Sequence, residues 1–251
     1  MKAILLTFFC LLLMVLTEAQ VLNIERERIR TDTTGWSGTG KASVNLISNT
    51  RKFLETGLNL HFQYKTERSL YLALSDYEVI KSEENDFSNK GMQHFRYNYK
   101  LGKVHTFEAF TQAQFNKVLN LNFRGLAGAG LRSKILGYDN FRLYTGVAYM
   151  LEYEESKINE LKEYNNRFSS YLSLTFKISD NLTIINTTYY QPRIDYLKDY
   201  RLSNNLDVIF RISKRLSYVL KFEHITDNQP LPEMPRVTYN LKNTLLFDFG
   251  K

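Results

Sequence analysis

Cysteine is almost absent from the 251-residue chain: its one cysteine, Cys10, lies in an apolar run near the N-terminus. This run, residues 3–16, is followed by Thr17 and Ala19 at the spacing of a signal-peptidase site. The pattern predicts a secretory signal peptide over residues 1–19. Without that segment, we expect a secreted chain that has no disulfide bonds and no thiol nucleophile.

Long hydrophobic runs are also missing. The run 3–16 is shorter than the roughly 20 residues that a spanning helix needs, and no later run approaches that length. Mean hydropathy is −0.34, and helical periodicity is not sustained anywhere. The sequence therefore excludes a helical inner-membrane protein and favours an all-β fold.

A two-residue alternation runs through the chain. In LETGLNLHFQYK, residues 54–65, Leu58 and Phe62 share one side of an extended chain with other apolar residues, while Asn59 and His61 lie on the other side. The same pattern recurs in about twelve segments, including 141–153, 168–178, 202–212 and 216–224. Such strands fit a barrel with an apolar face toward lipid, or a soluble sandwich with that face buried.

Strand length and connections favour the barrel. Many segments exceed 10 residues, whereas strands of globular proteins usually have about 5 or 6 and tilted spanning strands about 9 to 11. Long charged or proline-bearing loops are predicted from Ser82, Glu155 and Thr226. Tight turns alternate with them, at 66–68, 102–103, 179–181 and 213–215. Outer-membrane barrels have this asymmetry, with short turns in the periplasm and long loops outside.

Tyrosines near the predicted strand ends agree with interfacial aromatic girdles: Tyr64, Tyr97, Tyr99, Tyr149, Tyr153 and Tyr218. We predict an all-β, transmembrane, antiparallel up-and-down β-barrel of about twelve strands over residues 34–251, with both termini in the periplasm. Residues 20–33 carry charge on both faces and are expected to form a periplasmic N-terminal arm. A lipid-facing sheet has to close, since unpaired backbone is costly in lipid.

Three segments resemble a known family: TDTTGWSGTGKASVNL from Thr31, FEAFTQAQFNKVLNLNFRGLAGAGLR at 107–132, and QPLPEMP at 229–235. They are similar to the outer-membrane family catalogued as domain of unknown function 481, the salt-induced outer-membrane protein group. The resemblance covers most of residues 21–249. It implies an outer-membrane barrel and no known biochemical activity.

Two glycine-rich motifs do not predict nucleotide binding. GWSGTGKAS, from Gly35, nearly matches a phosphate-binding loop, but Ala42 replaces the hydroxyl residue that should hold Mg²⁺, and strands follow it instead of a helix. GLAGAG, at 125–130, has no βαβ unit around it. Small residues in a barrel strand instead let neighbours pack closely or bend the wall.

Polar residues on the inward faces are the candidate site residues. An acid, base and nucleophile set can be drawn from His61, His94, Glu108 and Ser173, but no spacing singles out one set. We therefore expect no enzyme activity, and neither a metal nor a cofactor is predicted. Mixed charges could cross-link the lumen or leave a narrow polar path. The predicted lumen network is Glu55, His61, His94, Arg96, Glu108, Arg124, Arg142, Asp207, Arg211, Lys221 and Glu223.

The leading interpretation is a non-enzymatic envelope component in the outer membrane. The alternatives are a narrow diffusion channel for small polar solutes, a lipid hydrolase or acyltransferase at the barrel rim, and a soluble periplasmic β-protein. Expected partners are outer-membrane lipids and lipopolysaccharide, and no nucleic acid. The barrel-assembly machinery is expected to recognise the last strand, whose aromatic Phe249 is followed by two further residues. The net charge of +7 is interpreted mainly as a solubility bias.

Overall fold

Twelve antiparallel strands form one sheet in the computed structural model, as the alternation predicted. The structure describes residues 34–48, 52–82, 86–117, 119–157, 161–213, 216–232 and 234–247. The predicted signal peptide, the N-terminal arm and Phe249 lie outside these residues. The strands are β1 (Gly35–Ser48), β2 (Lys52–Lys65), β3 (Ser69–Ser82), β4 (Asp86–Lys100), β5 (His105–Asn116), β6 (Leu121–Gly137), β7 (Phe141–Ser156), β8 (Lys162–Ser179), β9 (Leu182–Pro192), β10 (Tyr200–Arg211), β11 (Leu216–Asp227) and β12 (Val237–Phe247).

Each strand pairs with the next strand in the chain, from β1 to β12. Connections at one edge of the sheet, the short-turn edge, stay short, at 66–68, 101–104, 138–140, 180–181 and 212–215. Connections at the opposite, long-loop edge lengthen along the chain to 193–199 and 228–236. Gly35 pairs with Lys65, and Phe247 pairs with Leu216. The first and last strands therefore begin and end at the short-turn edge.

All three predicted long loops are partly strand, since Thr226 and Asp227 at the start of the third loop belong to β11. The loop expected from Ser82 is wrong over Asp86–Lys90, which belong to β4, and Lys81 pairs with Asp86 beside a register shift. Strand β8 likewise starts at Lys162, inside the loop expected from Glu155. In both places the pairing with the neighbouring strand continues beyond the apolar alternation, because backbone hydrogen bonds do not require apolar side chains.

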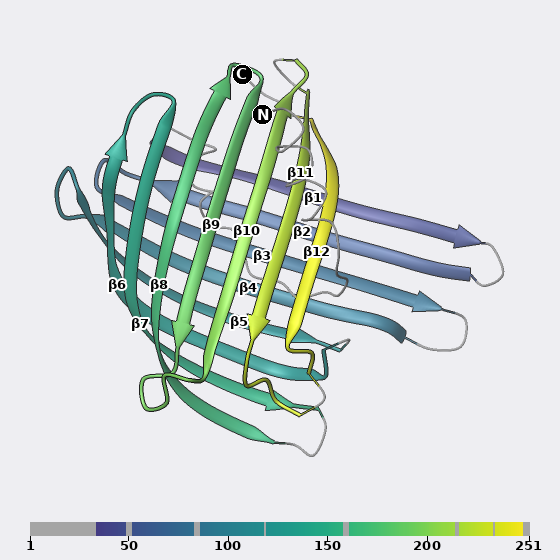
Figure 1. Ribbon diagram of the computed structural model, residues 1–251. Coiled ribbons are helices and arrows are strands. Elements are labelled where there is room, and N and C mark those ends of the chain that lie inside the picture. Colours follow the sequence, from purple (N-terminus) through teal and green to yellow (C-terminus); the bar gives the residue numbers. More distant parts are fainter. Residues whose placement is uncertain are drawn as a thin grey trace, which may run out of the picture.

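The sheet curls on itself. Figure 1 shows β1–β5 running across the view and β8–β12 running up the view in front of them, with β6 and β7 bending between the two groups. Inner-face side chains from distant strands can therefore meet. Adjacent strands of a sheet are rotated relative to one another by about 20 to 25°, and this twist accumulates over twelve strands.

The inner face is polar and the outer face is apolar. Among the described residues, buried polar and charged side chains outnumber buried hydrophobic ones by about two to one. Ser203, Asn205 and Asp207 on β10 are fully buried, whereas outward residues such as Leu172 and Phe95 are 45% and 52% exposed. This distribution is the reverse of a soluble core, in which buried positions are mostly apolar. The predicted direction of the two faces is thus confirmed for the described strands.

Aromatic rings form two belts on the outer face. Near the short-turn edge, Tyr71 lies 6.3 Å from Tyr64 and 4.9 Å from Tyr97 between ring centroids. Near the long-loop edge, the Tyr153 and Tyr164 rings lie 4.8 Å apart. The prediction that Tyr149 lies near a strand end is wrong, because β7 continues to Ser156.

Candidate functional site

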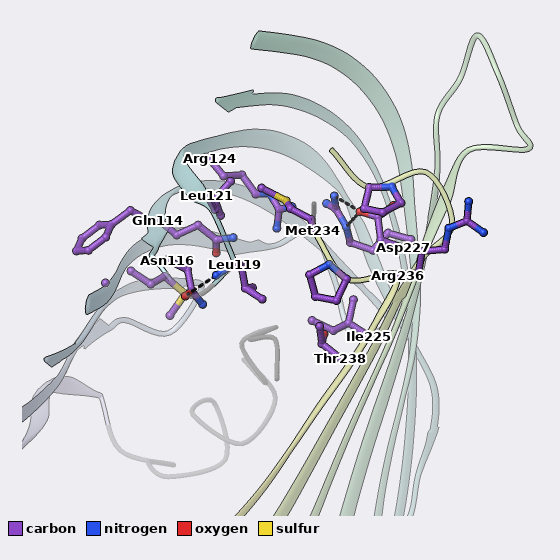
Figure 2. Close-up of a pocket in the computed structure, with 16 residues that line it drawn as sticks. Gln114, Asn116, Leu119, Leu121, Arg124, Ile225, Asp227, Met234, Arg236 and Thr238 are labelled. Atoms are coloured by element: carbon purple, nitrogen blue, oxygen red, sulfur yellow. Dashed lines mark hydrogen bonds and ion pairs between the residues drawn. The ribbon is translucent and has the colours of Figure 1, made fainter. Parts of the chain in front are cut away.

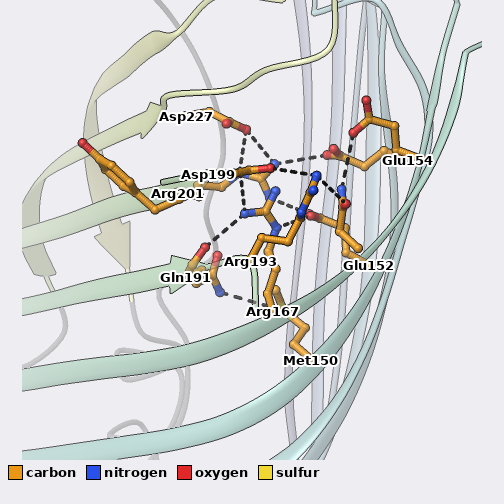
Figure 3. A network of polar contacts seen from close by, with 12 residues as sticks. Met150, Glu152, Glu154, Arg167, Gln191, Arg193, Asp199, Arg201 and Asp227 are labelled. Atoms are coloured by element: carbon orange, nitrogen blue, oxygen red, sulfur yellow. Dashed lines mark hydrogen bonds and ion pairs between the residues drawn. The ribbon is translucent and has the colours of Figure 1, made fainter. Parts of the chain in front are cut away.

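The inner face near the long-loop edge carries a dense set of charged side chains. On β7 the inward positions are Met150, Glu152 and Glu154, which follow the same two-residue period as the rest of the strand. Arg167 on β8 and Arg201 on β10 are also buried and inward. Figure 3 shows these side chains pointing toward one another from different strands.

Glu152 lies at the centre of the set. Arg167 Nε donates to its Oε2 at 2.5 Å, and Arg201 Nη1 donates to its Oε1 at 2.5 Å. The Arg124 Nε atom is 3.7 Å from Glu152 Oε1. Three guanidinium groups thus surround one carboxylate. The Glu152 side chain that carries it is fully buried. Charge-assisted hydrogen bonds of this kind are stronger than neutral ones.

Arg201 connects strands that are not neighbours in the sheet. Its Nη2 lies 3.2 Å from Glu154 Oε1 on β7 and 2.7 Å from Asp227 Oδ2 on β11. Its Nε also donates to Asp227 Oδ2, at 3.0 Å. Glu154 also forms an ion pair with Arg124 on β6. One side chain therefore joins β7, β10 and β11.

The contacts extend outward to the connection between β9 and β10. Arg167 Nη1 lies 3.0 Å from Asp199 Oδ1, and Arg193 Nη1 lies 3.3 Å from Asp199 Oδ2. Arg193 also donates to Asp195 at 2.7 Å, and this hydrogen bond lowers the pKa of the exposed Asp195 carboxyl. The Arg193 side chain is 27% exposed, so its guanidinium also reaches solvent.

We call these ion-paired residues, most of which are buried, the ionic layer. Its cations and anions balance, four against four, because its members are Arg124, Arg167, Arg193 and Arg201 with Glu152, Glu154, Asp199 and Asp227. Burial of a charge is costly unless it is paired and hydrogen-bonded. The mutual pairing makes this polar layer tolerable inside the curled sheet.

Two small cavities lie on either side of the ionic layer. One, of about 60 Å³, lies near the long-loop edge, where Leu119 and Leu121 face Ile225 and Met234 across the interior (Figure 2). The other, of about 80 Å³, lies deeper, beside Tyr171. Both are lined by Gln114, Arg124 and Arg201. Each has room for only a few water molecules.

The middle of the inner face holds a second polar group. Arg96 Nη1 and the Tyr171 hydroxyl contact the same Glu108 oxygen, at 3.1 and 3.0 Å. Arg96 Nε donates to His94 Nε2 at 3.3 Å, so the His94 Nδ1 proton points to Gln112 Oε1, 3.0 Å away. Both ring nitrogens of His94 are engaged by neighbouring side chains, which is the arrangement of a structural histidine.

Glycines allow aromatic rings to lie flat against the inner wall. A Cβ atom on Gly128 would lie 2.6 Å from the Phe110 ring, and one on Gly146 would lie 2.1 Å from the Tyr171 ring. The Tyr171 ring also packs on Tyr189, with 5.2 Å between centroids. Gly125–Gly130 thus lies in strand β6, and close packing against small residues is confirmed there.

The structure brings together some of the predicted network residues. His94, Arg96 and Glu108 meet in the middle group, and Arg124 joins the ionic layer. Lys221 and Glu223 form a separate pair at 2.6 Å. The remaining predicted residues occupy other inner-face positions: His61 and Asp207 are buried, Glu55 is half-buried, and Arg142 and Arg211 are exposed at the short-turn edge. Ser173 contacts Thr187 at 3.2 Å.

Most of the ionic layer escaped the sequence prediction. Glu152, Glu154, Arg167 and Arg201 follow the two-residue period of the predicted segments 141–153, 168–178 and 202–212. The parity signal was present, but Glu154, Arg167 and Arg201 lie just outside those segments, and Glu152 was not among the candidate lumen residues. Asp199 lies in a connection, where no alternation could have identified it.

Among the described residues, no group of three or more His, Cys, Asp or Glu side chains has the arrangement of a metal site. Within the same ranges, no helix is long and apolar enough to span a membrane. The acidic side chains of the ionic layer contact arginines instead.

Solved structures of outer-membrane proteins have a similar fold. The NanC porin structure aligns over 85% of this chain and 98% of its own, with a TM-score of 0.50 and 12% sequence identity. The KdgM porin aligns over 86% and 99%, with a TM-score of 0.47 and 12% identity. The translocator domain of the autotransporter NalP from Neisseria meningitidis aligns over 91% and 93%, with a TM-score of 0.45 and 10% identity. No curated protein matches the sequence.

The twelve-stranded curled sheet with a polar inner face is therefore the fold of an outer-membrane β-barrel that resembles porins. The sequence matches the family described as protein of unknown function, DUF481, over residues 30–249. The chain belongs to this family, as the three quoted sequence segments indicated.

Proposed function

We propose that this protein is a non-enzymatic component of the outer membrane: a closed twelve-stranded barrel whose lumen is held shut near its outer end by the ionic layer. The observation that carries the proposal is the reversed distribution of side chains, because an exposed apolar wall around a polar interior suits lipid outside. The ends of β1 and β12 at the short-turn edge support a periplasmic location for that edge.

The spacing of the two aromatic belts supports a membrane span. Phe141, whose ring lies 6.1 Å from that of Phe176, and Tyr153 stand twelve positions apart on β7. At about 3.4 Å per residue and a tilt of about 45°, this separation corresponds to roughly 29 Å across the membrane. The hydrocarbon core of a bilayer is about 30 Å thick.

The ionic layer supports a closed lumen. Its ion pairs link β6, β7, β8, β10 and β11, and one of them joins positions 49 residues apart in sequence. The cavities on both sides are small. Solute would have to separate several buried ion pairs to pass, and a buried charge without its partner is costly.

A narrow diffusion channel for small polar solutes is the second candidate. It is favoured by the two cavities, which meet at Gln114, Arg124 and Arg201 and would join if these side chains moved apart. The name porin of the similar NanC structure agrees with this alternative. Conductance therefore separates the two candidates.

The membrane orientation of the wall is tested at two adjacent positions. Leu58 and Asn59 are both exposed, but they lie on opposite faces of β2. In a Cys10→Ser background, spin labels at Leu58→Cys and Asn59→Cys are compared in lipid vesicles. We expect strong relaxation by dissolved oxygen only at position 58, since oxygen concentrates in lipid.

Equal oxygen access at both positions would contradict the membrane orientation. Strong access of a water-soluble metal chelate at position 58 would do the same. Because both parent residues are exposed, burial in a protein core would not explain a difference between the two labels.

A further inference from the structure

A groove lies on the outer wall near the short-turn edge, outside the lumen. It has a volume of about 720 Å³, and its lining runs from β1 to β5. Trp36, which lines it, is 79% exposed. Contiguous exposed apolar surface of this kind marks contact with lipid or with a partner. The outward rings that line the groove are Trp36, Phe62, Tyr64, Tyr71, Phe95 and Tyr97.

Two alanines form the floor of the groove. Ala73 pairs with Phe62 on one side and with Phe95 on the other, and Ala109 pairs with Tyr97. Directly paired residues point to the same face of a sheet, so each methyl group stands beside much larger rings. The groove therefore follows from alanines at outward positions between aromatic residues.

The strand register carries the groove away from the short-turn edge. One cross-strand row runs through Trp36, Tyr64, Tyr71, Tyr97 and Ala109. Trp36 is the second residue of β1, whereas Ala109 is the fifth residue of β5. Four strand spacings of about 4.8 Å, at a tilt of about 45°, correspond to roughly 14 Å of depth. This is close to half of the bilayer's hydrocarbon core of about 30 Å, the depth of one leaflet.

The shallow end of the groove carries groups that suit a lipid headgroup. The Trp36 and Tyr64 rings lie 4.8 Å apart there, and tryptophan and tyrosine prefer the headgroup level of a membrane. Arg68 and Lys100 are exposed at the same edge, where the Lys100 N–H donates to the Arg68 carbonyl oxygen at 2.8 Å. Glu67 is the one acidic residue of this turn. The long stems of the two cations let their charged groups reach the headgroup level.

We infer that the groove binds one phospholipid of the periplasmic leaflet, with an acyl chain over Ala73 and Ala109 and the phosphate near Arg68 and Lys100. The inference rests on the proposed membrane orientation, which makes lipid the molecule in contact with this wall. A second copy of the chain could also cover apolar surface. The depth of one leaflet and the cations at one end match a phospholipid instead.

Trp36 lines the groove and is the only tryptophan, so its fluorescence reports on the occupant. Phosphatidylglycerol with brominated acyl chains, which quench tryptophan on contact, is titrated into the purified protein in a non-ionic detergent. We expect quenching that saturates at a low fraction of lipid, because one site fills. Lipid that only mixes with the detergent around the wall would quench in proportion to its mole fraction.

Ala109→Phe should weaken the binding by about tenfold or more, the loss expected when about two methylene groups of the acyl chain leave the groove. Ala129→Phe is the matched control. Ala129 pairs directly with Ala109 and is exposed on the same face, but it does not line the groove. This control should change the affinity by less than about twofold.

The double variant Arg68→Gln/Lys100→Gln should weaken binding of phosphatidylglycerol by about fivefold or more, because cations near an anionic headgroup contribute to binding. Lys177→Gln is its control: it removes a cation at the same edge that pairs with Asp180, at 2.7 Å, away from the groove. It should change the affinity by less than about twofold.

Quenching of the wild type that rises linearly without saturation would overturn the inference. Equal affinities in Ala109→Phe and Ala129→Phe would do the same, as would unchanged affinity in the double variant. A dimer in light scattering whose Trp36 is not quenched would assign the groove to a second copy and also overturn it. The spin labels at positions 58 and 59 test the membrane orientation separately, so the lipid site can fail while the proposed function stands.

Discussion

The two ends of the barrel interior place their cationic side chains in different surroundings. Near the long-loop edge, four arginines and four carboxylates neutralise one another in the ionic layer. Near the short-turn edge, a cavity of about 200 Å³ is lined by four cationic residues, Lys65, Arg68, Lys100 and Arg132. The first arrangement pairs charges from distant strands, whereas the second combines one buried arginine, which stacks on the Tyr144 ring, with three cations that are closer to solvent.

The comparison shows why a count of lumen charges is a poor guide to function. Arg201 and Arg132 are both buried, inward-facing arginines. Arg201 forms ion pairs with Glu152, Glu154 and Asp227, while Arg132 stacks on Tyr144. Arg201 therefore cross-links three strands, whereas the Arg132 guanidinium packs against an aromatic ring of the neighbouring strand.

The largest effect is expected from breaking the centre of the ionic layer. Glu152→Gln removes the carboxylate that contacts Arg124, Arg167 and Arg201 and leaves their charges poorly compensated. Breaking a buried ion pair typically costs about 3–5 kcal/mol. We expect a loss of this size in the free energy of unfolding, measured by urea titration in vesicles with the fluorescence of the only tryptophan, Trp36.

Glu155→Gln is the control for this variant. Glu155 lies on the same strand, but it faces outward and bonds to Asn122 and Tyr153 at a partly exposed position. A stability loss in Glu155→Gln as large as that in Glu152→Gln would show that the ionic layer is not special.

A smaller effect is expected midway between the two ends. In Gly146→Ala, the new Cβ would lie 2.1 Å from the Tyr171 ring, whose hydroxyl holds Glu108. Overpacking of this kind costs about 1–3 kcal/mol. In Gly102→Ala the added methyl group meets nothing within 4 Å, so the urea midpoint should barely move. Equal midpoints for the two variants would contradict the close packing at Gly146.

The smallest effect is expected at the cationic end. Lys100→Gln removes one of the four cations that line the cavity at the short-turn edge, and Lys100 is exposed. Relief of repulsion should offset the lost hydrogen bond, so the free energy of unfolding should change by less than about 0.5 kcal/mol. A loss comparable to that of Glu152→Gln would contradict the expectation that Lys100 contributes little to stability.

Sequence alone predicted the fold well because alternation is a local property. The faces of 168–178 and 202–212 followed directly from side-chain period. The ionic layer could not be predicted in the same way, since Glu152 and Arg201 are 49 residues apart and meet only because the sheet curls. Asp199 and Arg193 depend in addition on the path of a connection, which no periodicity specifies.

Conductance of the purified wild-type protein in planar bilayers tests the closed lumen most directly. If the ionic layer shuts the barrel, current steps should be absent or far smaller than those of a porin, and Glu152→Gln should open more often because its arginines are no longer held together. Large, steady steps from the wild type would contradict the closed lumen and establish the channel in its place.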